Sequence, residues 1–308
     1  APGSAWYEAN RGDAQAIETA TELADAALMN AITNRHASAQ DLRQRALKAK
    51  DGKLLAQARA EYRQAADSYA TFLKQHPAAK NAYEYSYLLA ESQYYAGDYA
   101  AAAGTYARVR DADLRGKHME EAAYGAVKAN EHVALAALSG AASTGPAAKS
   151  ASGAAFDADD DVSRPLSDAL PALPAVGKTA ATPQAMAVPD EVAALQSAYD
   201  RYVALQPTHD RASLIAYKAA ELDFRYLRFD RARTRFAAVL DRYCQSERAV
   251  DAGNAILVSH TIDGNLDQVE SWTGRLQLKG CGGQGALAQQ QRDSLRKLSD
   301  DVSFKKAE

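Results

Sequence analysis

Apolar and polar residues recur along most of this chain with the period of a helix. Over residues 13–36 and again over 39–75, apolar positions return every three or four residues, as on one face of an amphipathic helix. A break is expected at 51–52, and His76-Pro77 ends the second segment because proline cannot continue a helix. No segment alternates apolar and polar residues as a half-buried strand does, so the pattern predicts an all-α chain of roughly 12–15 helices.

The two halves of the sequence register without a gap under one fixed offset, the repeat offset, which carries Tyr69 onto Tyr199. What recurs is side-chain bulk and smallness rather than identity, as the packing of a duplicated module requires. The matched pairs are Tyr69 and Tyr199, Phe72 and Tyr202, Pro77 and Pro207, Tyr87 and Tyr217, Ala90 and Ala220, Glu91 and Glu221, Tyr94 and Phe224, Tyr99 and Phe229, Ala102 and Ala232, Tyr106 and Phe236, and Val109 and Val239.

A segment of different composition separates the halves. Residues 139–190 contain six of the nine prolines and are rich in alanine, so they are expected to form a largely irregular, low-complexity linker. Short apolar parts of it, such as LSDALPALPAV at 166–176, are able to dock on a neighbouring surface. The predicted domains are 1–138, a helical hairpin plus one repeat module, and 191–308, a second module with a degenerate last repeat and a C-terminal helix.

Within each module the spacing resembles the tetratricopeptide repeat, a helix–turn–helix unit of about 34 residues. The first copy shows the turn Gly97-Asp98-Tyr99, and Arg228 is interpreted as standing where Gly97 stands, which predicts a degenerate second turn. The resemblance implies a right-handed solenoid of helical hairpins that stack because one unit cannot bury its apolar face alone. The small and bulky positions that carry it are Leu89, Ala90, Ala102, Tyr106 and Val109, with Ala219, Ala220, Ala232, Phe236 and Val239 in the second copy.

The same resemblance places the first helix of each unit on a concave groove. Its members are aromatic and charged side chains on one helix face, which offer contact area with polar tips. For Tyr94 and Phe224 the inter-repeat core is an equal alternative, and the expected ligand is a peptide, a helix or the protein's own linker. The predicted groove residues are Tyr87, Glu91, Tyr94, Tyr95, Tyr217, Glu221, Phe224 and Arg225.

Cys244 and Cys281 both fall, in the repeat alignment, at the unit-ending position that Pro77 and Pro207 mark. Equivalent positions of stacked units lie on one edge, so the two cysteines are predicted to form a disulfide. Such a bond would stabilise the last unit by about 3–4 kcal/mol in the chain-entropy model and would indicate an oxidising compartment. The alternative is a pair of free thiols in a cytosolic protein.

Composition and motifs argue against several function classes. The net charge of −3 disfavours nucleic-acid binding, and no apolar run reaches the about 18 residues of a membrane span. The six histidines are scattered without zinc-ligand spacing, and the GCGGQG spelling at 280–285 lacks the strand of a dinucleotide site. No nucleophile or carboxylate pair forms a catalytic constellation, so we predict no enzyme activity, no cofactor and no metal.

The phrase YRQAADSYATFLKQHPAAKNAYEYSYLLAESQYYAGDYAAAAGTYARVRD is similar to repeat proteins of Gram-negative envelopes. These include the outer-membrane assembly lipoprotein of the BamD kind, the coordinator of the Tol–Pal system and periplasmic repeat proteins of gliding motility. The resemblance implies a non-enzymatic, periplasmic scaffold that binds other proteins of an envelope machine. The alternatives are a cytosolic adaptor for peptide tails and a cell-wall-processing enzyme on a helical solenoid.

Overall fold

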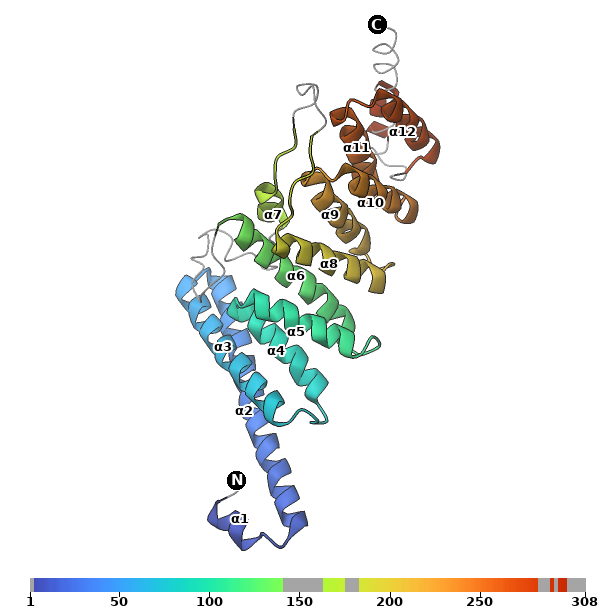
Figure 1. Ribbon diagram of the computed structural model, residues 1–308. Helices are drawn as coiled ribbons and strands as arrows, with labels where there is room; N and C mark the ends of the chain where they lie inside the picture. The colour runs from blue at the N-terminus through green and yellow to red at the C-terminus, as the bar shows by residue number, and fades with distance from the viewer. Residues whose placement is uncertain (1–2, 141–162, 175–182, 282–288, 291–292, 298–308) are drawn as a thin grey trace. The chain divides into compact units, whose positions relative to one another are not determined.

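The computed structural model describes residues 3–140, 163–174, 183–281, 289–290 and 293–297. Within these ranges the regular structure is helical throughout, which confirms the predicted all-α class (Figure 1). Most of the predicted linker, and much of the predicted C-terminal helix, lie outside the described residues. The described helices are α1 (Ala5–Ala9), α2 (Ala14–Ala49), α3 (Gly52–Gln75), α4 (Ala82–Ala96), α5 (Tyr99–Ala112), α6 (Met119–Leu138), α7 (Ser163–Ala169), α8 (Asp190–Leu205), α9 (Ala212–Arg225), α10 (Phe229–Arg242), α11 (Glu247–Ile262) and α12 (Leu266–Lys279).

The chain divides into two compact units, and the boundary falls inside α6, between Ala129 and Asn130. The sequence placed this boundary at the start of the linker, after residue 138. The difference has a specific cause, because the carboxylate of Glu131 accepts hydrogen bonds from the Tyr199 hydroxyl (2.7 Å) and the Lys218 ammonium (2.8 Å). These contacts attach the last turns of α6 to α8 and α9 in the second unit.

The first unit is built from helical hairpins in which α2 packs on α3, α3 on α4, and α4 on α5. Helix α2 runs unbroken through the short gap left between 36 and 39, because the Ala and Ser there do not stop a helix. The expected break at 51–52 is present. Lys50 adopts a left-handed conformation, and the Asp51 side chain accepts hydrogen bonds from the first backbone N–H groups of α3.

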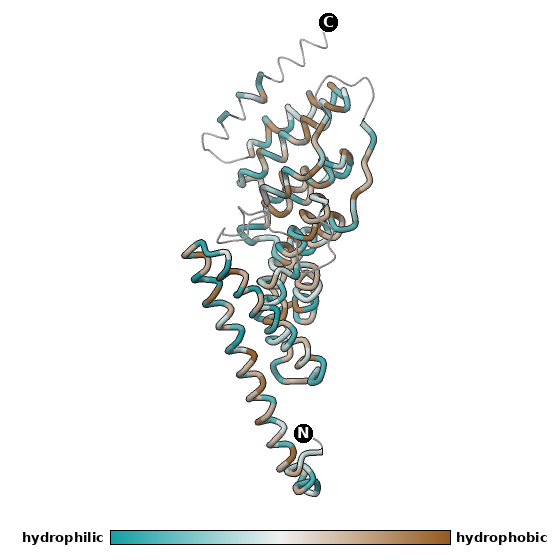
Figure 2. Tube along the Cα trace, turned by 90° about the vertical axis from the view of Figure 1, so that its left-hand side faces the viewer, coloured by the Kyte–Doolittle hydropathy of each residue, from teal (hydrophilic) through white to brown (hydrophobic). Residues whose placement is uncertain are grey.

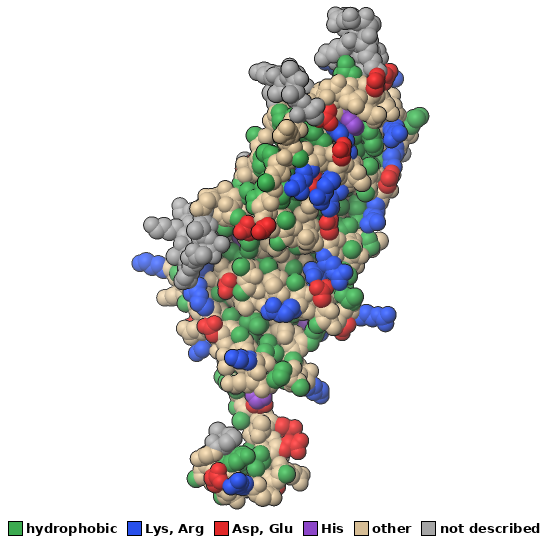
Figure 3. All heavy atoms as spheres, viewed as in Figure 1, with side chains coloured by type: hydrophobic (Ala, Val, Ile, Leu, Met, Phe, Trp, Pro, Cys, Tyr) green, Lys and Arg blue, Asp and Glu red, His purple; other side chains and the backbone are tan. Residues whose placement is uncertain are grey.

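The N-terminal part of α2 extends beyond the helices that pack against its C-terminal part (Figures 1 and 2). The first buried residue of α2 is Met29, and the contact with α3 reaches Asp25, which pairs with His76 at the C-terminal end of α3. Beyond this point Leu23 is exposed, as is Trp6 in α1. Figure 3 shows hydrophobic side chains at the surface of this end of the first unit. The apolar residues of α1 and of the first turns of α2 are therefore not buried by the described part of the first unit.

The turn between the two helices of each repeat corrects one sequence assignment. Gly97 has φ of 87°, and the residue with positive φ in the second copy is Leu227, at 57°, rather than Arg228. Arg228, at φ of −88°, instead takes the helix N-cap position that Asp98 holds in the first copy. The repeat offset, applied strictly, makes the same match, since it carries position 97 onto 227.

We expect Gly97→Ala to lower the free energy of unfolding of the first unit by about 1 kcal/mol, because an L side chain is strained at this φ. The matched control is Gly104→Ala in the interior of α5, where the added Cβ meets only the end of the Arg108 side chain at 3.6 Å. That change should raise stability by about 0.5–1 kcal/mol through helix propensity. Urea unfolding followed by circular dichroism measures both, and equal signs for the two variants would contradict the turn assignment.

The second unit continues the same plan. Helix α8 packs on α9, α9 on α10, α10 on α11, and α11 on α12. Its core joins these helices through fully buried Phe236, Ile256 and Val269 with small residues such as Ala220 and Ala232. The segment interpreted as a degenerate last repeat is a complete hairpin, because α11 and α12 carry apolar residues at helical spacing on their facing sides.

Candidate functional site

A stripe of side chains along α9 holds another segment of the chain in the second unit. The Arg225 guanidinium donates hydrogen bonds to three backbone carbonyl oxygens at the end of α7: Ser167 at 3.1 Å, Leu170 at 2.9 Å and Pro171 at 2.6 Å. One turn earlier on α9, the Glu221 carboxyl is hydrogen-bonded to the side chain of Ser167. Arg225 and Glu221 were both predicted as groove residues, and both contact residues of the segment predicted as the linker.

The bound segment, residues 163–174, also buries apolar side chains. Leu166 and Leu170 retain only 4% and 6% of their exposure, and Leu173 packs against the core of the second unit. A seven-residue helix cannot bury leucines against itself, so these side chains are covered by the rest of the fold. The segment is therefore held by both its backbone and its aliphatic side chains.

The first repeat arranges the equivalent positions differently. The Tyr106 hydroxyl donates a hydrogen bond to the Glu91 carboxylate at 2.7 Å, so the donor to Glu91 comes from the same hairpin. Tyr87 lies parallel to the ring of His118, with 4.0 Å between ring centroids, and His118 in turn contacts Glu84. These contacts leave Tyr87 and Glu91 half-buried.

The sequence reasoning missed a basic residue that covers the tyrosine in each repeat. His118 covers Tyr87, and Arg248, from the first turn of α11, lies over the Tyr217 ring at 6.0 Å from its centroid. The repeat offset carries position 118 onto 248, so the signal was present in the alignment. Residue identity alone does not mark this pair, because His and Arg differ in size and type, although both can cap an aromatic face.

One substitution distinguishes the two grooves. Phe236 occupies the position of Tyr106 and has no hydroxyl to offer Glu221, whereas Tyr106 serves Glu91. Burial raises the pKa of both Glu91 and Glu221. In the second repeat the hydroxyl that reaches the carboxyl comes from Ser167 of the bound segment instead.

The remaining predicted groove residues divide between surface and core. Tyr94 and Phe224 are 6% and 7% exposed and belong to the cores of their units, so for these two residues the structure favours the core alternative over the groove. Each turns toward the second helix of its hairpin, where Tyr94 contacts Tyr99 and Phe224 contacts Phe229. Tyr95 is half-buried, with the Arg43 guanidinium 4.3 Å from its ring centroid.

The raised pKa of Glu91 gives a pH-dependent prediction. The folded state holds this proton more tightly than the unfolded chain does, so the stabilisation by protonation is complete below the ordinary pKa of 4.5 and is lost as pH rises through the folded-state pKa. Glutamine does not ionise, so Glu91→Gln avoids the cost of a buried carboxylate above that pKa. We therefore expect the variant to be more stable than the wild type at pH 7. Its advantage should shrink toward pH 4.

Urea midpoints measured between pH 4 and pH 8 follow this difference. Glu22→Gln, at an exposed position on α2, is the control and should show a pH-independent offset. An advantage of Glu91→Gln that grows on acidification would contradict the assigned direction of the pKa shift.

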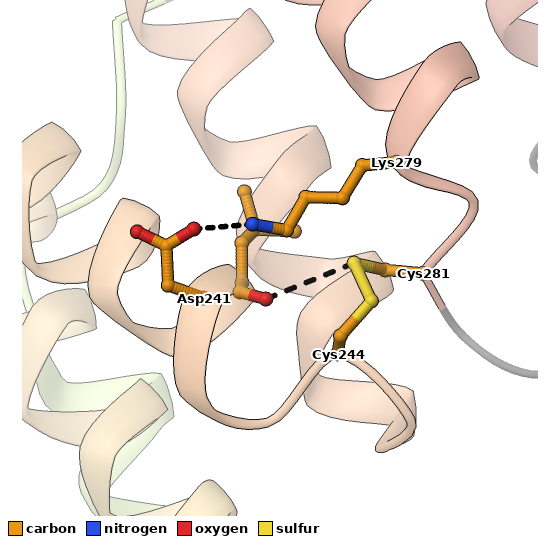
Figure 4. Close-up of a disulfide and its surroundings, with 5 residues drawn as sticks. Asp241, Cys244, Lys279 and Cys281 are labelled. Atoms are coloured by element: carbon orange, nitrogen blue, oxygen red, sulfur yellow. Dashed lines mark hydrogen bonds and ion pairs between the residues drawn. A yellow bond between two sulfur atoms is a disulfide. The ribbon is translucent and has the colours of Figure 1, made fainter.

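The two cysteines form a disulfide bond that joins the end of α10 to the end of α12 (Figure 4). Their Cα atoms are 4.6 Å apart, and the sulfur of Cys281 lies 3.7 Å from the carbonyl oxygen of Leu240. Beside the bond, Lys279 pairs with Asp241 between the same two helices. The repeat alignment placed both cysteines at unit ends, and these ends meet on one edge of the second unit.

Two solved structures of helical-repeat proteins resemble this chain at low similarity. A tetratricopeptide repeat protein from Parabacteroides merdae covers 88% of this chain and 92% of its own, with 11% identity and a TM-score of 0.25. The de novo designed helical repeat protein DHR64 covers 92% of this chain and 100% of its own, with 13% identity and a TM-score of 0.20. No protein-family model matches the chain, and no curated protein matches it either.

None of the helices in the described part of the chain is both long and apolar enough to cross a membrane. Nor do the described ranges bring together three His, Cys, Asp or Glu side chains in a group that could hold a metal ion. The feature of this fold with evident binding geometry is the α9 stripe with the peptide segment that it holds.

Proposed function

We propose that this protein is a non-enzymatic scaffold that binds peptide segments of other proteins on the first helices of its repeats. The observation that carries the proposal is the set of hydrogen bonds from Arg225 to three main-chain carbonyl oxygens, because a surface that binds one peptide backbone can bind another. Glu221, one turn away, adds a carboxyl that takes a hydroxyl donor. The tetratricopeptide-like hairpins provide the rigid helices on which such a groove is built.

The proposed setting is the bacterial periplasm, in an envelope complex such as a motility or outer-membrane machine. The disulfide between Cys244 and Cys281 supports an oxidising compartment over the cytosol, where thiols are kept reduced. The resemblance of residues 62–111 to envelope repeat proteins supports the class of complex. Alkylating free thiols in intact cells with a membrane-permeant reagent before lysis tests the setting, since a cytosolic adaptor would carry two alkylated cysteines and a disulfide-bonded periplasmic scaffold would carry none.

Site-specific photo-crosslinking tests the binding surface. Leu214 is 38% exposed and lies two turns before Glu221 on the same face of α9, so a benzophenone amino acid fits there without disturbing the core. The matched control position is Thr234, exposed on α10. In the native host, we expect position 214 to capture discrete partner proteins and position 234 to capture none. Equal capture from both positions, or none from 214, would remove the support for this surface.

A further inference from the structure

The surface of α9 that carries Glu221 and Arg225 is termed the α9 groove. We propose that residues 163–174 are an intramolecular ligand of the α9 groove, and that the partner is a peptide of the same chemistry which displaces them. This inference rests on the proposed function and adds to it the kind of ligand and a form of autoinhibition. The chemistry is a short helical turn with leucines spaced four and three residues apart, ended by proline. Leu166, Leu170 and Leu173 have that spacing, and Pro171 follows the turn.

The backbone contacts define what any ligand must offer. All three hydrogen bonds from Arg225 go to carbonyl oxygens at the C-terminal end of α7. The last carbonyls of a helix have no partners within it and carry partial negative charge, so a buried or half-buried arginine is a favourable cap. A partner segment that ends a helical turn at the same place presents the same carbonyls, whatever its sequence.

The side-chain contacts add selectivity. Leu173 packs against the core cluster that contains Ala220 and Phe224 of α9. Leu166 and Leu170 are buried as well, so a ligand that takes the place of the segment needs aliphatic side chains at these positions to exclude water. Ser167 lies between them and reaches Glu221, which favours a residue with a hydroxyl or another donor at that position. A leucine-rich, serine-containing turn satisfies all three requirements, and an acidic side chain opposite Glu221 is disfavoured.

The groove of the second repeat is suited to exchange of its occupant. In the first repeat the hydroxyl of Tyr106, in the same hairpin, donates a hydrogen bond to Glu91. Phe236 has no hydroxyl, so a hydroxyl donor for Glu221 comes from the segment that occupies the groove. The occupant is a helix of seven residues, too short to be stable on its own. Its order therefore depends on the contacts it makes with the groove.

The test uses the full chain and a fluorescein-labelled peptide with the sequence of residues 163–174, SRPLSDALPALP. In the opened variant, Leu166→Ser with Leu170→Ser, the internal segment loses its buried side chains and leaves the groove available. An intramolecular ligand acts at an effective concentration on the order of 1 mM, so the wild type should bind the peptide at least about tenfold more weakly than the opened variant. Fluorescence anisotropy measures both affinities, and circular dichroism checks that both chains are folded.

Three further comparisons locate the binding. Adding Arg225→Gln to the opened variant should weaken peptide binding at least about tenfold, since a charge-assisted contact to three carbonyls is lost. Arg242→Gln, at an exposed position on α10, should leave the affinity of the opened variant unchanged. A peptide with the same two leucine-to-serine changes should not bind either chain.

Equal affinity of the wild type and the opened variant would overturn autoinhibition, and an opened variant that binds no peptide would overturn the exchangeable ligand. In either case crosslinking from position 214 still decides whether other proteins bind the groove. Amide hydrogen exchange of the wild type covers the case in which the opened variant fails to fold. Exchange of residues 166–170 should be faster than that of α9, and protection of both segments to the same extent would mean that 163–174 is a fixed part of the fold.

Discussion

Changing Cys281 to Ser is expected to lower the free energy of unfolding of the last helical hairpin by about 3–4 kcal/mol. The disulfide closes a loop across a sequence separation of 37 residues that contains α11 and α12. Without it, the unfolded loop gains conformational entropy, while the folded hairpin keeps only its packing against α10. Because repeat units contact mainly their neighbours, the loss should be concentrated in the terminal hairpin.

The measurement can be made local because the chain has two tryptophans, Trp6 in α1 and Trp272 in α12. In a Trp6→Phe background, Trp272 fluorescence during urea unfolding reports on the last hairpin alone. The oxidised parent should unfold at higher urea than Cys281→Ser, and the reduced parent should match the variant. Identical midpoints for the oxidised and reduced parent would show that the bond does not stabilise this hairpin.

Changing Glu131 to Ala should destabilise the second unit by about 3–5 kcal/mol, the usual cost of removing one member of a buried ion pair. Glu131 is 4% exposed, and it accepts hydrogen bonds from the Tyr199 hydroxyl and the Lys218 ammonium. The alanine variant leaves that ammonium and that hydroxyl facing a cavity. Hydrogen exchange of α8 and α9, together with urea unfolding, measures the loss.

A matched double variant separates the cost of an unpaired charge from the value of the pair. Glu131→Leu combined with Lys218→Met replaces both charges with apolar groups of similar length, and it should recover most of the stability lost in Glu131→Ala. If the double variant is as unstable as the single one, the side-chain shape at Glu131 matters more than its charge, and the ion-pair explanation is wrong.

The candidate site was partly predictable from the sequence. The repeat offset identified Glu221 and Arg225 as positions on a repeated helix face, and both contact the bound segment. It could not separate Tyr217, which is half-buried under Arg248, from Phe224, which belongs to the core. Positions seven residues apart on a helix point within about 20° of the same direction, so the pattern alone does not distinguish them, and which of them is covered depends on the side chains that pack there.

The role of residues 163–174 illustrates the same limit. Their proline and alanine content predicts irregular structure, and the leucines within LSDALPALPAV indicated only that the segment was able to dock. The choice of Arg225 as its anchor depends on where α9 ends relative to α7. That relation joins positions far apart in the chain, as the 55-residue separation of Leu170 and Arg225 shows.

The sequence by itself determined the helical class, the repeat register, and the placement of both cysteines at unit ends. These features follow from local periodicity and from the spacing of small and bulky residues, which a linear pattern records directly. Only the tertiary structure decided that the unit boundary lies inside α6, that Leu227 takes the left-handed turn, and that the α9 groove holds the chain's own segment. Each of these depends on which side chains meet across long sequence separations, where the energy of burial and hydrogen bonding outweighs local preference.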